Sequence, residues 1–344
     1  MNEVKSALWS DASGLPESLS ESLGRADGHA EMASALADPS VRRVVVSGNG
    51  ASWYAANAMW LAALGSEAEV EVLTVPAGML AAGGFRWRDG DFLLALSSSG
   101  SLRDLLEALD DPRLPRPFGV ITADADSPLG RSADLRALVF VKQQRAVTHS
   151  QAYLGTLLVG LDLIGRVARD AGLRDAVAGV PELVSGQLDE APGWAAETLA
   201  GFPMLPPRAA VAFGTGAAWP AAQEAALLLK EVAAIPTEGV ETREGATTGM
   251  YALDEQHLVI SLGLADDRLA DEAAAVCAGR GAQVLSIPWP VGGDRQVAAA
   301  AHFLHPLALA ISLALVQGLD PDQPSWYAAY ESTARRQTQP EEQR

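Results

Sequence analysis

The chain is poor in cysteine and in basic residues. Its 344 residues include one cysteine, Cys277, which excludes a disulfide framework and a cysteine-rich metal site and favours a reducing, cytoplasmic location. There are 25 basic residues against 43 acidic ones, giving a net charge of -18. This balance argues against a broad surface for nucleic acid or for an anionic membrane. An anionic ligand must therefore be held by local donors.

Long apolar runs and a targeting segment are also missing. No stretch reaches the roughly 18 uninterrupted apolar residues that span a bilayer. The longest candidate, 303–316, is interrupted by His305, Pro306 and Ser312 and is interpreted as a buried helix. The N-terminal sequence MNEVKSALWSDASG has no basic segment followed by an apolar core, so no signal peptide is expected. With 49% hydrophobic residues, the chain can bury one large core or two medium ones.

Strand-like and helix-like segments alternate along the first half of the chain. β-branched and aliphatic runs occur at 42–47, 70–75, 92–96, 118–122 and 138–141. Helix-like segments lie at 52–64, 78–83 and 102–108, and a long apolar helix is expected at 150–168. This alternation predicts a parallel sheet with helices on both faces.

The alternation starts again after a polar to mixed segment at 169–207, which is interpreted as a helix and a connector. Strands are expected at 209–213, 257–262 and 283–287, and helices at 220–233 and 267–280. The sequence VAFGT at 211–215 leads into a glycine turn similar to the turn after the strand at 42–47. An internal duplication of one α/β unit is therefore expected.

Two loops in the first half have the features of an anion site. The runs VVVSGNGAS at 44–52 and FLLALSSSGS at 92–101 each pass from a strand through a small, hydroxyl-rich loop into a helix. Such a loop directs backbone N–H groups and a helix N-terminus at an anion. The candidate ligands of a phosphate are Gly50, Ser52, Ser97, Ser98, Ser99 and Ser101. Without a lysine, the loops do not match a Walker nucleotide site, so a phosphate on a small molecule is the better interpretation. The alternative role of these serines is helix capping, and both roles are compatible.

Five segments of the chain resemble the sugar isomerase (SIS) domain family in its double-domain form. They are LWSDASGLPESL at 8–19, the loops Gly50-Ala51-Ser52 and Ser97-Ser98-Ser99-Gly100, QEAALLLKEVAAIPTEG at 223–239, and DPDQP at 320–324. They are similar to the isomerase half of glutamine–fructose-6-phosphate amidotransferase and to aminosugar-phosphate deaminases and deglycases. The resemblance implies an α/β fold of two SIS domains, each a parallel sheet flanked by helices in a flavodoxin-like three-layer sandwich.

The resemblance also implies a domain plan and a set of partners. It consists of an N-terminal helical segment at 1–30, a first SIS domain at 31–170, a helical connector at 171–207, and a second SIS domain at 208–330 with a tail at 320–344. The implied ligand is a small-molecule sugar phosphate. The family needs no cofactor and no metal, and a homodimer is expected.

The chain differs from the family at positions where the family usually has acid–base residues. The family's Gly-Glu-Leu-Lys-His-Gly-Pro segment, whose histidine helps to open the sugar ring, is replaced by a segment without histidine from Glu244 to Gly249. The tail at 325–333, SWYAAYEST, lacks the lysine that engages the sugar carbonyl. Leu102 stands where the serine loop usually carries a threonine. The chain therefore keeps the loops that resemble the family's phosphate site but lacks two of the family's acid–base residues.

The candidate catalytic residues are carboxylates and one histidine. The resemblance makes Glu231 the base that moves a proton between C1 and C2, and its apolar surroundings favour a raised pKa. A solvated carboxylate paired with Lys230 or Arg243 is the alternative. Glu244 or Glu238 is a candidate second acid, or else both are solvated.

Histidines and tail aromatics leave further alternatives open. The resemblance also implies Thr148 and Ser150, in a segment where the family contacts its substrate, as substrate or phosphate ligands. His149 between them is a candidate to replace the lost histidine. His302 and His305 have metal-ligand spacing, but no carboxylate cluster accompanies them, and a buried structural role is commoner. The aromatic residues of the tail either stack on a sugar or fix the tail to the core. The expected function is isomerisation or deamination of an aminosugar phosphate, or deglycation; the alternative is a non-catalytic phosphosugar sensor.

Overall fold

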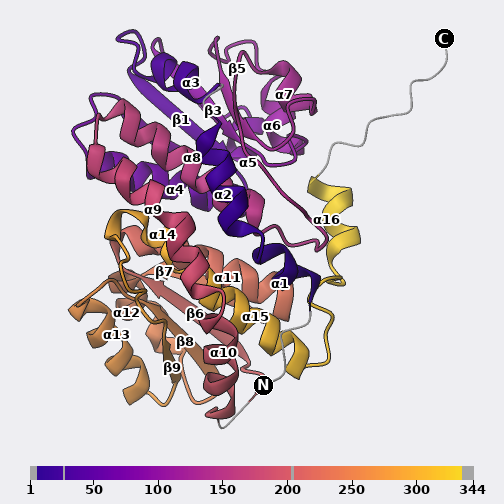
Figure 1. Cartoon of the computed structure of the whole chain (residues 1–344), viewed down its shortest axis with the longest axis vertical. Coiled ribbons are helices and arrows are strands. Elements are labelled where there is room, and N and C mark those ends of the chain that lie inside the picture. The colour runs from indigo at the N-terminus through magenta and orange to yellow at the C-terminus, as the bar shows by residue number, and fades with distance from the viewer. Residues whose placement is uncertain (1–5, 26–27, 203–204, 335–344) are drawn as a thin grey trace, which may run out of the picture.

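Two parallel β-sheets, one above the other in Figure 1, form the framework of the protein. The computed structural model describes residues 6–25, 28–202 and 205–334. The first sheet has the strand order β2-β1-β3-β4-β5. Its strands are β1 (Arg43–Gly48), β2 (Glu71–Pro76), β3 (Asp91–Leu96), β4 (Gly119–Thr122) and β5 (Leu135–Leu138).

The second sheet repeats this order in its four strands. It runs β7-β6-β8-β9, so β6 takes the place of β1 and β8 the place of β3. The strands are β6 (Ala209–Gly214), β7 (Thr237–Glu241), β8 (His257–Leu262) and β9 (Gln283–Ser286). All pairings in both sheets are parallel, which agrees with the expected duplication.

Helices cover both faces of each sheet. In the first half, α2 (Leu15–Gly24), α3 (His29–Leu36), α4 (Ala51–Leu64) and α8 (Gln151–Val167) pack on one face, and α5 (Ala77–Ala81), α6 (Arg103–Ala108) and α7 (Pro128–Ser132) on the other. In the second half, α9 (Ala171–Gln187), α10 (Glu190–Ala200), α11 (Trp219–Ala233), α14 (Ala298–Ala301) and α15 (Leu304–Val316) lie on one side, and α12 (Thr242–Thr247) and α13 (Arg268–Gly279) on the other. The chain begins with α1 (Ala7–Ala12) and ends with α16 (Tyr327–Ala334).

Alternating side chains of the strands divide between two layers of core, because successive residues of a strand face opposite sides of the sheet. Val44 and Val46 of β1 enter the core that both halves share, whereas Val45 enters an outer core under α5 and α6. In the second sheet, Ala212 enters the shared core and Phe213 the outer one. The shared core holds the two halves together and fixes α4 against α11.

The predicted fold class, α/β with two parallel sheets flanked by helices, is confirmed. The fifth strand was expected at 138–141 but lies at Leu135–Leu138. The N–H of Val139 still donates to the carbonyl oxygen of Thr122 in β4 at 2.9 Å, but the next N–H, that of Phe140, donates to Ser22 Oγ at 2.9 Å and the pairing ends. The segment at 169–207 contains two helices, α9 and α10, although Pro181 lies inside α9.

One strand, β7, was not expected from the sequence. It is an edge strand whose residues are partly exposed, so it has no apolar run. The domain limits drawn from the sequence stay predictions. Residues 1–5, 26–27, 203–204 and 335–344 of those domains lie outside the described residues.

The stretch Arg295–Val316 combines a 3-10 turn with α14 and α15. Within the described residues, it alone is long and apolar enough to cross a membrane, with 22 residues and a mean hydropathy of 1.8. However, 83% of its most apolar window is buried inside the molecule. It therefore has the position of a core helix.

Candidate active site

A cleft of about 390 Å3 lies at the carboxyl ends of β1 and β3, where the two halves of the chain meet. The first half contributes loops 49–52, 98–99 and 145–149. The second half contributes Glu224, Leu227 and Glu231 from one face of α11. The C-terminal tail completes the lining of the cleft with Trp326, Tyr327 and Tyr330. The cleft thus joins segments that are far apart in the sequence.

The serine loops form one wall of this cleft, as the sequence predicts. Gly50, Ser52, Ser98 and Ser99 line it, and Ser52 lies in the first turn of α4. Gly100 has φ of +58°, and a Cβ there would lie 1.8 Å from Ser127 Oγ, so only glycine fits this turn. The wall therefore offers hydroxyl groups and a helix N-terminus to an anion.

Three of the predicted phosphate ligands do not line the cleft. Ser97 is buried, with 5% of its surface exposed, and Ser150 is buried at the start of α8. The hydroxyl of Ser101 donates to Ser99 Oγ at 3.0 Å, which places it behind a lining residue. A four-serine run in a sequence does not show which of its hydroxyl groups line a cleft, and the assignment of this loop to a phosphate stays a prediction.

Glu231 lies in the wall opposite the serines. Its Oε2 accepts a hydrogen bond from Thr148 Oγ1 at 3.3 Å, so the predicted residues Thr148 and Glu231 come together in the cleft. Burial raises the pKa of Glu231 to about 7, against smaller opposing effects of Thr148 and Lys230. A carboxyl group with such a pKa exchanges protons readily near neutral pH.

Glu224, which sequence reasoning missed, is a second carboxyl group in the same wall. It lies two turns before Glu231 on α11 and is 3% exposed. Burial, with a smaller contribution from the charge of Glu231, raises its pKa well above the usual range. The spacing of seven residues, which puts both side chains on one helix face, is the signal that was available in the sequence.

Of the other predicted acid–base residues, one lines the cleft and two do not. His149 lines the cleft, but its side chain is exposed at the rim. Glu238 on β7 and Glu244 on α12 are exposed and do not line the cleft. The structure thus brings His149 to the cleft and does not bring Glu244 there.

His302 and His305 are core residues. His302 Nε2 contacts the carbonyl oxygen of Gly263 at 2.7 Å, and its ring packs against Trp289. His305 packs against Trp194, and burial lowers the pKa of both histidines to about 4. No cluster of three or more potential metal ligands occurs in the described ranges.

The tail is fixed across the cleft at two points. Trp326 Nε1 donates to the carbonyl oxygen of Glu231 at 2.8 Å. Asp322, in the DPDQP segment, accepts from the N–H groups of Ala7 and Leu8 at 2.7 and 2.8 Å and thereby caps α1. Trp326 therefore anchors the tail, as one of the two interpretations expects, and because it also lines the cleft, stacking on a sugar stays a prediction.

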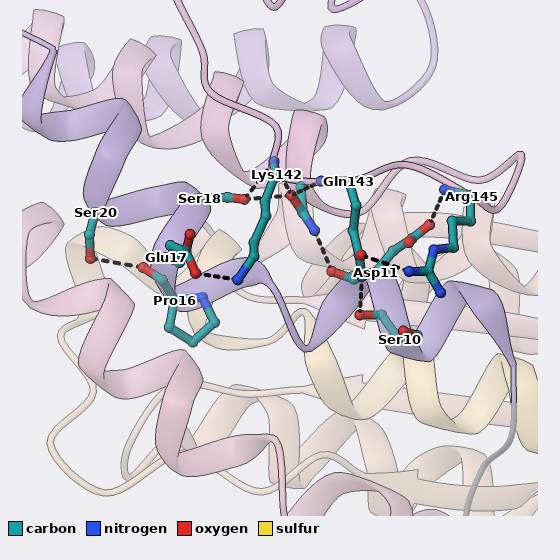
Figure 2. Close-up of polar contacts among 10 residues, drawn as sticks. Ser10, Asp11, Pro16, Glu17, Ser18, Ser20, Lys142, Gln143 and Arg145 are labelled. Carbon is teal, nitrogen blue, oxygen red and sulfur yellow. Dashed lines mark hydrogen bonds and ion pairs between the residues drawn. The ribbon is translucent and has the colours of Figure 1, made fainter.

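The N-terminal helices support the loop that carries Arg145 and Thr148. Figure 2 shows Asp11 of α1 against this loop, where its Oδ2 accepts from the N–H of Arg145 at 2.7 Å. The same oxygen accepts from the N–H of Ala146 at 2.9 Å. A second, exposed link joins Glu17 of α2 to Lys142 (Figure 2). The cleft wall therefore depends on contacts with a segment about 130 residues away.

Comparisons with known proteins identify the fold. No protein-family model matches the sequence, and a search of curated proteins finds no relative. Solved structures nevertheless match nearly the whole chain. The C-terminal domain of glucosamine-fructose-6-phosphate aminotransferase from Francisella tularensis has a TM-score of 0.79 and 19% identity, covering 93% of this chain and 98% of that one. The chain folds as a double SIS domain.

Two further solved structures share this double SIS fold. Glucosamine-6-phosphate deaminase from Thermotoga maritima matches with a TM-score of 0.76 and 18% identity over 93% of this chain and 98% of that one. Tagatose-6-phosphate ketose/aldose isomerase from Escherichia coli matches with a TM-score of 0.74 and 16% identity over 92% and 95%. The predicted recognition is therefore confirmed at the level of the fold.

The second SIS half has a carboxylate where the first half has its serine wall. Asp267 lies between β8 and α13, and its Oδ1 accepts from the N–H groups of Leu269 and Ala270, both at 3.1 Å. Its Oδ2 accepts from the N–H of Leu264 at 3.2 Å. Burial opposes ionisation of Asp267, but hydrogen bonds from Thr215 and from these backbone groups lower its pKa overall.

Proposed function

We propose that this double SIS chain binds a sugar phosphate in the cleft and transfers a proton between C1 and C2. The reaction is an aldose–ketose isomerisation linked to loss of an amine, as in a deaminase or a deglycase. The observation that carries the proposal is the position of Glu231, a carboxyl group with a pKa of about 7, opposite the serine wall. The names of the matched structures, which refer to sugar phosphates and aminosugar phosphates, agree with it.

The residues of the cleft divide the work of such a reaction. Ser52 in the first turn of α4, with Ser98 and Ser99 in the loop after β3, holds the phosphate through hydroxyl groups. The Glu231 carboxylate takes the proton from carbon, and the C–H electron pair forms the carbon–carbon double bond. The π pair of the carbonyl group moves to its oxygen, which takes a proton from water to give an enediol or enolamine. The Glu231 acid then returns its proton to the neighbouring carbon while the O–H proton leaves to water, and where C2 carries nitrogen, water hydrolyses the resulting imine and releases the amine. Thr148 orients the Glu231 carboxyl through its hydrogen bond.

An open groove beside Glu231 provides room for an amine substituent. Its volume is about 460 Å3, and it shares Glu231, Trp326 and Tyr330 with the cleft. Lys230 also lines it. A substrate with a group attached through nitrogen at C1 or C2 fits this arrangement better than a bare hexose phosphate does, and this favours the deglycase form of the proposal.

The test of the proposal is exchange of the C2 proton of D-glucosamine 6-phosphate with solvent deuterium. An enzyme of this type catalyses the exchange, which proton NMR follows directly. A phosphosugar sensor binds the compound, as a thermal-shift assay shows, without any exchange. Binding without exchange would therefore favour the sensor, and neither binding nor exchange would contradict the assignment of the cleft.

Replacing Ser98 and Ser99 together by Ala is expected to weaken binding of D-glucosamine 6-phosphate at least tenfold. The change removes two hydrogen bonds to a charged group, each contributing about 1.5–3 kcal/mol. Calorimetric titration measures the affinity. Ser132→Ala, an exposed serine of α7, is the matched control. An affinity equal to that of the unmodified protein would show that the phosphate binds at another place.

The rate of exchange is expected to fall about tenfold per pH unit below pH 7 and to level off above it. The base form of Glu231 is the active one, and its raised pKa of about 7 means that acid protonates and inactivates it. Initial rates of deuterium exchange between about pH 5.5 and 8.5 measure the profile. A flat profile over this range would rule out Glu231 as the base.

Two expectations from the sequence stay predictions. They are the homodimer and the cytoplasmic location. Sedimentation and fractionation test them.

A further inference from the structure

Glu224 and Glu231 form a pair of carboxyl groups on one face of α11. Seven residues are two turns of helix, so the two side chains point the same way and are about 10 Å apart along the axis. Both line the cleft. Leu227 lies between them and faces Gly50, since a Cβ at Gly50 would lie 3.8 Å from Leu227 Cδ2. The N-terminus of α4, where the phosphate is proposed to bind, therefore contacts α11 between Glu224 and Glu231.

The two acids have different surroundings. Glu231 accepts a hydrogen bond from Thr148. Glu224 is 3% exposed, and its Oε2 has no hydrogen-bond partner within the part of the chain that the structure describes. Tyr54 and Tyr153 lie close enough for the charge of Glu224 to raise their pKa values, although burial is the larger cause. An unpaired buried carboxylate is costly, so Glu224 is neutral and carries a proton.

A protonated carboxyl in a cleft wall needs an acceptor that the protein itself does not supply. Tyr153, the nearest buried hydroxyl, is also without a partner in the described residues. A sugar ring carries oxygen atoms that accept hydrogen bonds. The unsatisfied group thus points to the ligand as its partner.

We propose that Glu224 is the acid that opens the sugar ring, in the role for which this chain has no family histidine. The proposal rests on binding of a sugar phosphate in the cleft, as proposed above. Glu224 donates its proton to the ring oxygen while the bond from that oxygen to the anomeric carbon breaks, and the oxygen keeps the bonding electron pair. The anomeric hydroxyl loses its proton to solvent water and becomes the carbonyl. The ring oxygen ends as a hydroxyl group and Glu224 as a carboxylate, which takes a proton back from water. Glu231 stays a carboxylate, ready to act as the base at carbon, so protons and electrons balance.

His149 is the other group of the cleft that suits this step. His149 is exposed, whereas only 3% of the Glu224 surface is exposed. A proton on a buried acid is protected from exchange with water until the ligand arrives. The structure therefore favours Glu224, and His149 becomes an outcome of the test.

Ring opening is measured separately from chemistry at carbon. Two-dimensional exchange NMR follows interconversion of the α and β anomers of D-glucosamine 6-phosphate, which requires opening and reclosing of the ring. The unmodified protein is expected to accelerate it, and Glu224→Gln to reduce this acceleration at least ~100-fold. Glutamine matches the neutral acid in shape but has no acidic proton, so the fold is kept. Glu197→Gln, on an exposed face of α10, is the matched control.

A second probe needs no ring opening. D-erythrose 4-phosphate stays open, because its terminal oxygen carries the phosphate. Exchange of the C2 proton of this sugar with deuterium is expected to fall less than about tenfold in Glu224→Gln, far less than its anomer exchange, whereas Glu231→Gln is expected to lose the C2 exchange. Should the glutamine variant misfold, Glu224→Ala with added formate replaces it, and formate is expected to restore part of the anomer exchange.

The outcomes separate the two proposals. Anomer exchange that survives in Glu224→Gln overturns the assignment and leaves His149 as the acid. Loss of C2 exchange with both sugars in Glu224→Gln also overturns it, because the residue then acts at carbon. Acceleration of anomer exchange by the unmodified protein, without any C2 exchange, contradicts the proposed function; if Glu224→Gln abolishes that acceleration, the role of Glu224 stands. No acceleration by the unmodified protein overturns the role of Glu224.

Discussion

Glu231→Gln is expected to reduce C2 deuterium exchange at least ~100-fold, a change of about 2.7 kcal/mol in the activation free energy. Glutamine keeps the size of the side chain and accepts the hydrogen bond from Thr148, but it does not take a proton from carbon. The expected loss is therefore in the rate and not in binding. Rates at saturating D-glucosamine 6-phosphate and calorimetric affinities measure the two effects.

The control for this variant is Glu197→Gln, which makes the same change on an exposed surface of α10. It is expected to leave both quantities unchanged. Full exchange activity in Glu231→Gln would exclude the mechanism and return the search for the base to His149 and Glu224. A protein that binds the sugar but shows no exchange in any form would be a sensor.

Asp11→Ala is expected to lower the free energy of unfolding by about 3 kcal/mol and to weaken ligand binding as well. Asp11 is fully buried, and its loss leaves the N–H groups of Arg145 and Ala146 without an acceptor. The loop that they begin lines the cleft. Urea unfolding and calorimetric titration measure the two losses.

Glu17→Ala is the matched control, because Glu17 joins the same two parts of the chain through an exposed ion pair with Lys142. Exposed ion pairs contribute less than about 1 kcal/mol, so this variant is expected to unfold almost like the unmodified protein. Equal losses in the two variants would show that the buried carboxylate has no special role in holding the loop.

The sequence was sufficient to predict the architecture. Buried parallel strands occur in it as apolar runs, and the glycine and serine residues after each run mark the end of the strand. The runs at 44–47 and 92–96 are of this kind, and both are strands of the first sheet. The half-exposed edge strand β7 leaves no such run and was missed. The limits of β5 were misplaced because a side chain of another element, Ser22, ends its pairing.

The site was predicted less completely than the fold, for a related reason. Position on a loop follows from local sequence, which is how Ser52, Ser98 and Ser99 were found. Burial of a polar side chain depends on distant elements, and this is what distinguishes Glu224 from any exposed helix carboxylate. The contact between Thr148 and Glu231 joins residues 83 positions apart, so local sequence does not predict it.

Asp267 has a consequence for stoichiometry. In the second half of the chain, the carboxylate of Asp267 accepts from the N–H groups of the loop after β8 and of the start of α13. The corresponding loop of the first half, after β3, lines the cleft instead. Because an acidic side chain already occupies the donors of the second half, we expect an anion to bind only in the cleft, to which α11 contributes Glu224 and Glu231. Each chain is therefore expected to take up one sugar phosphate and not two.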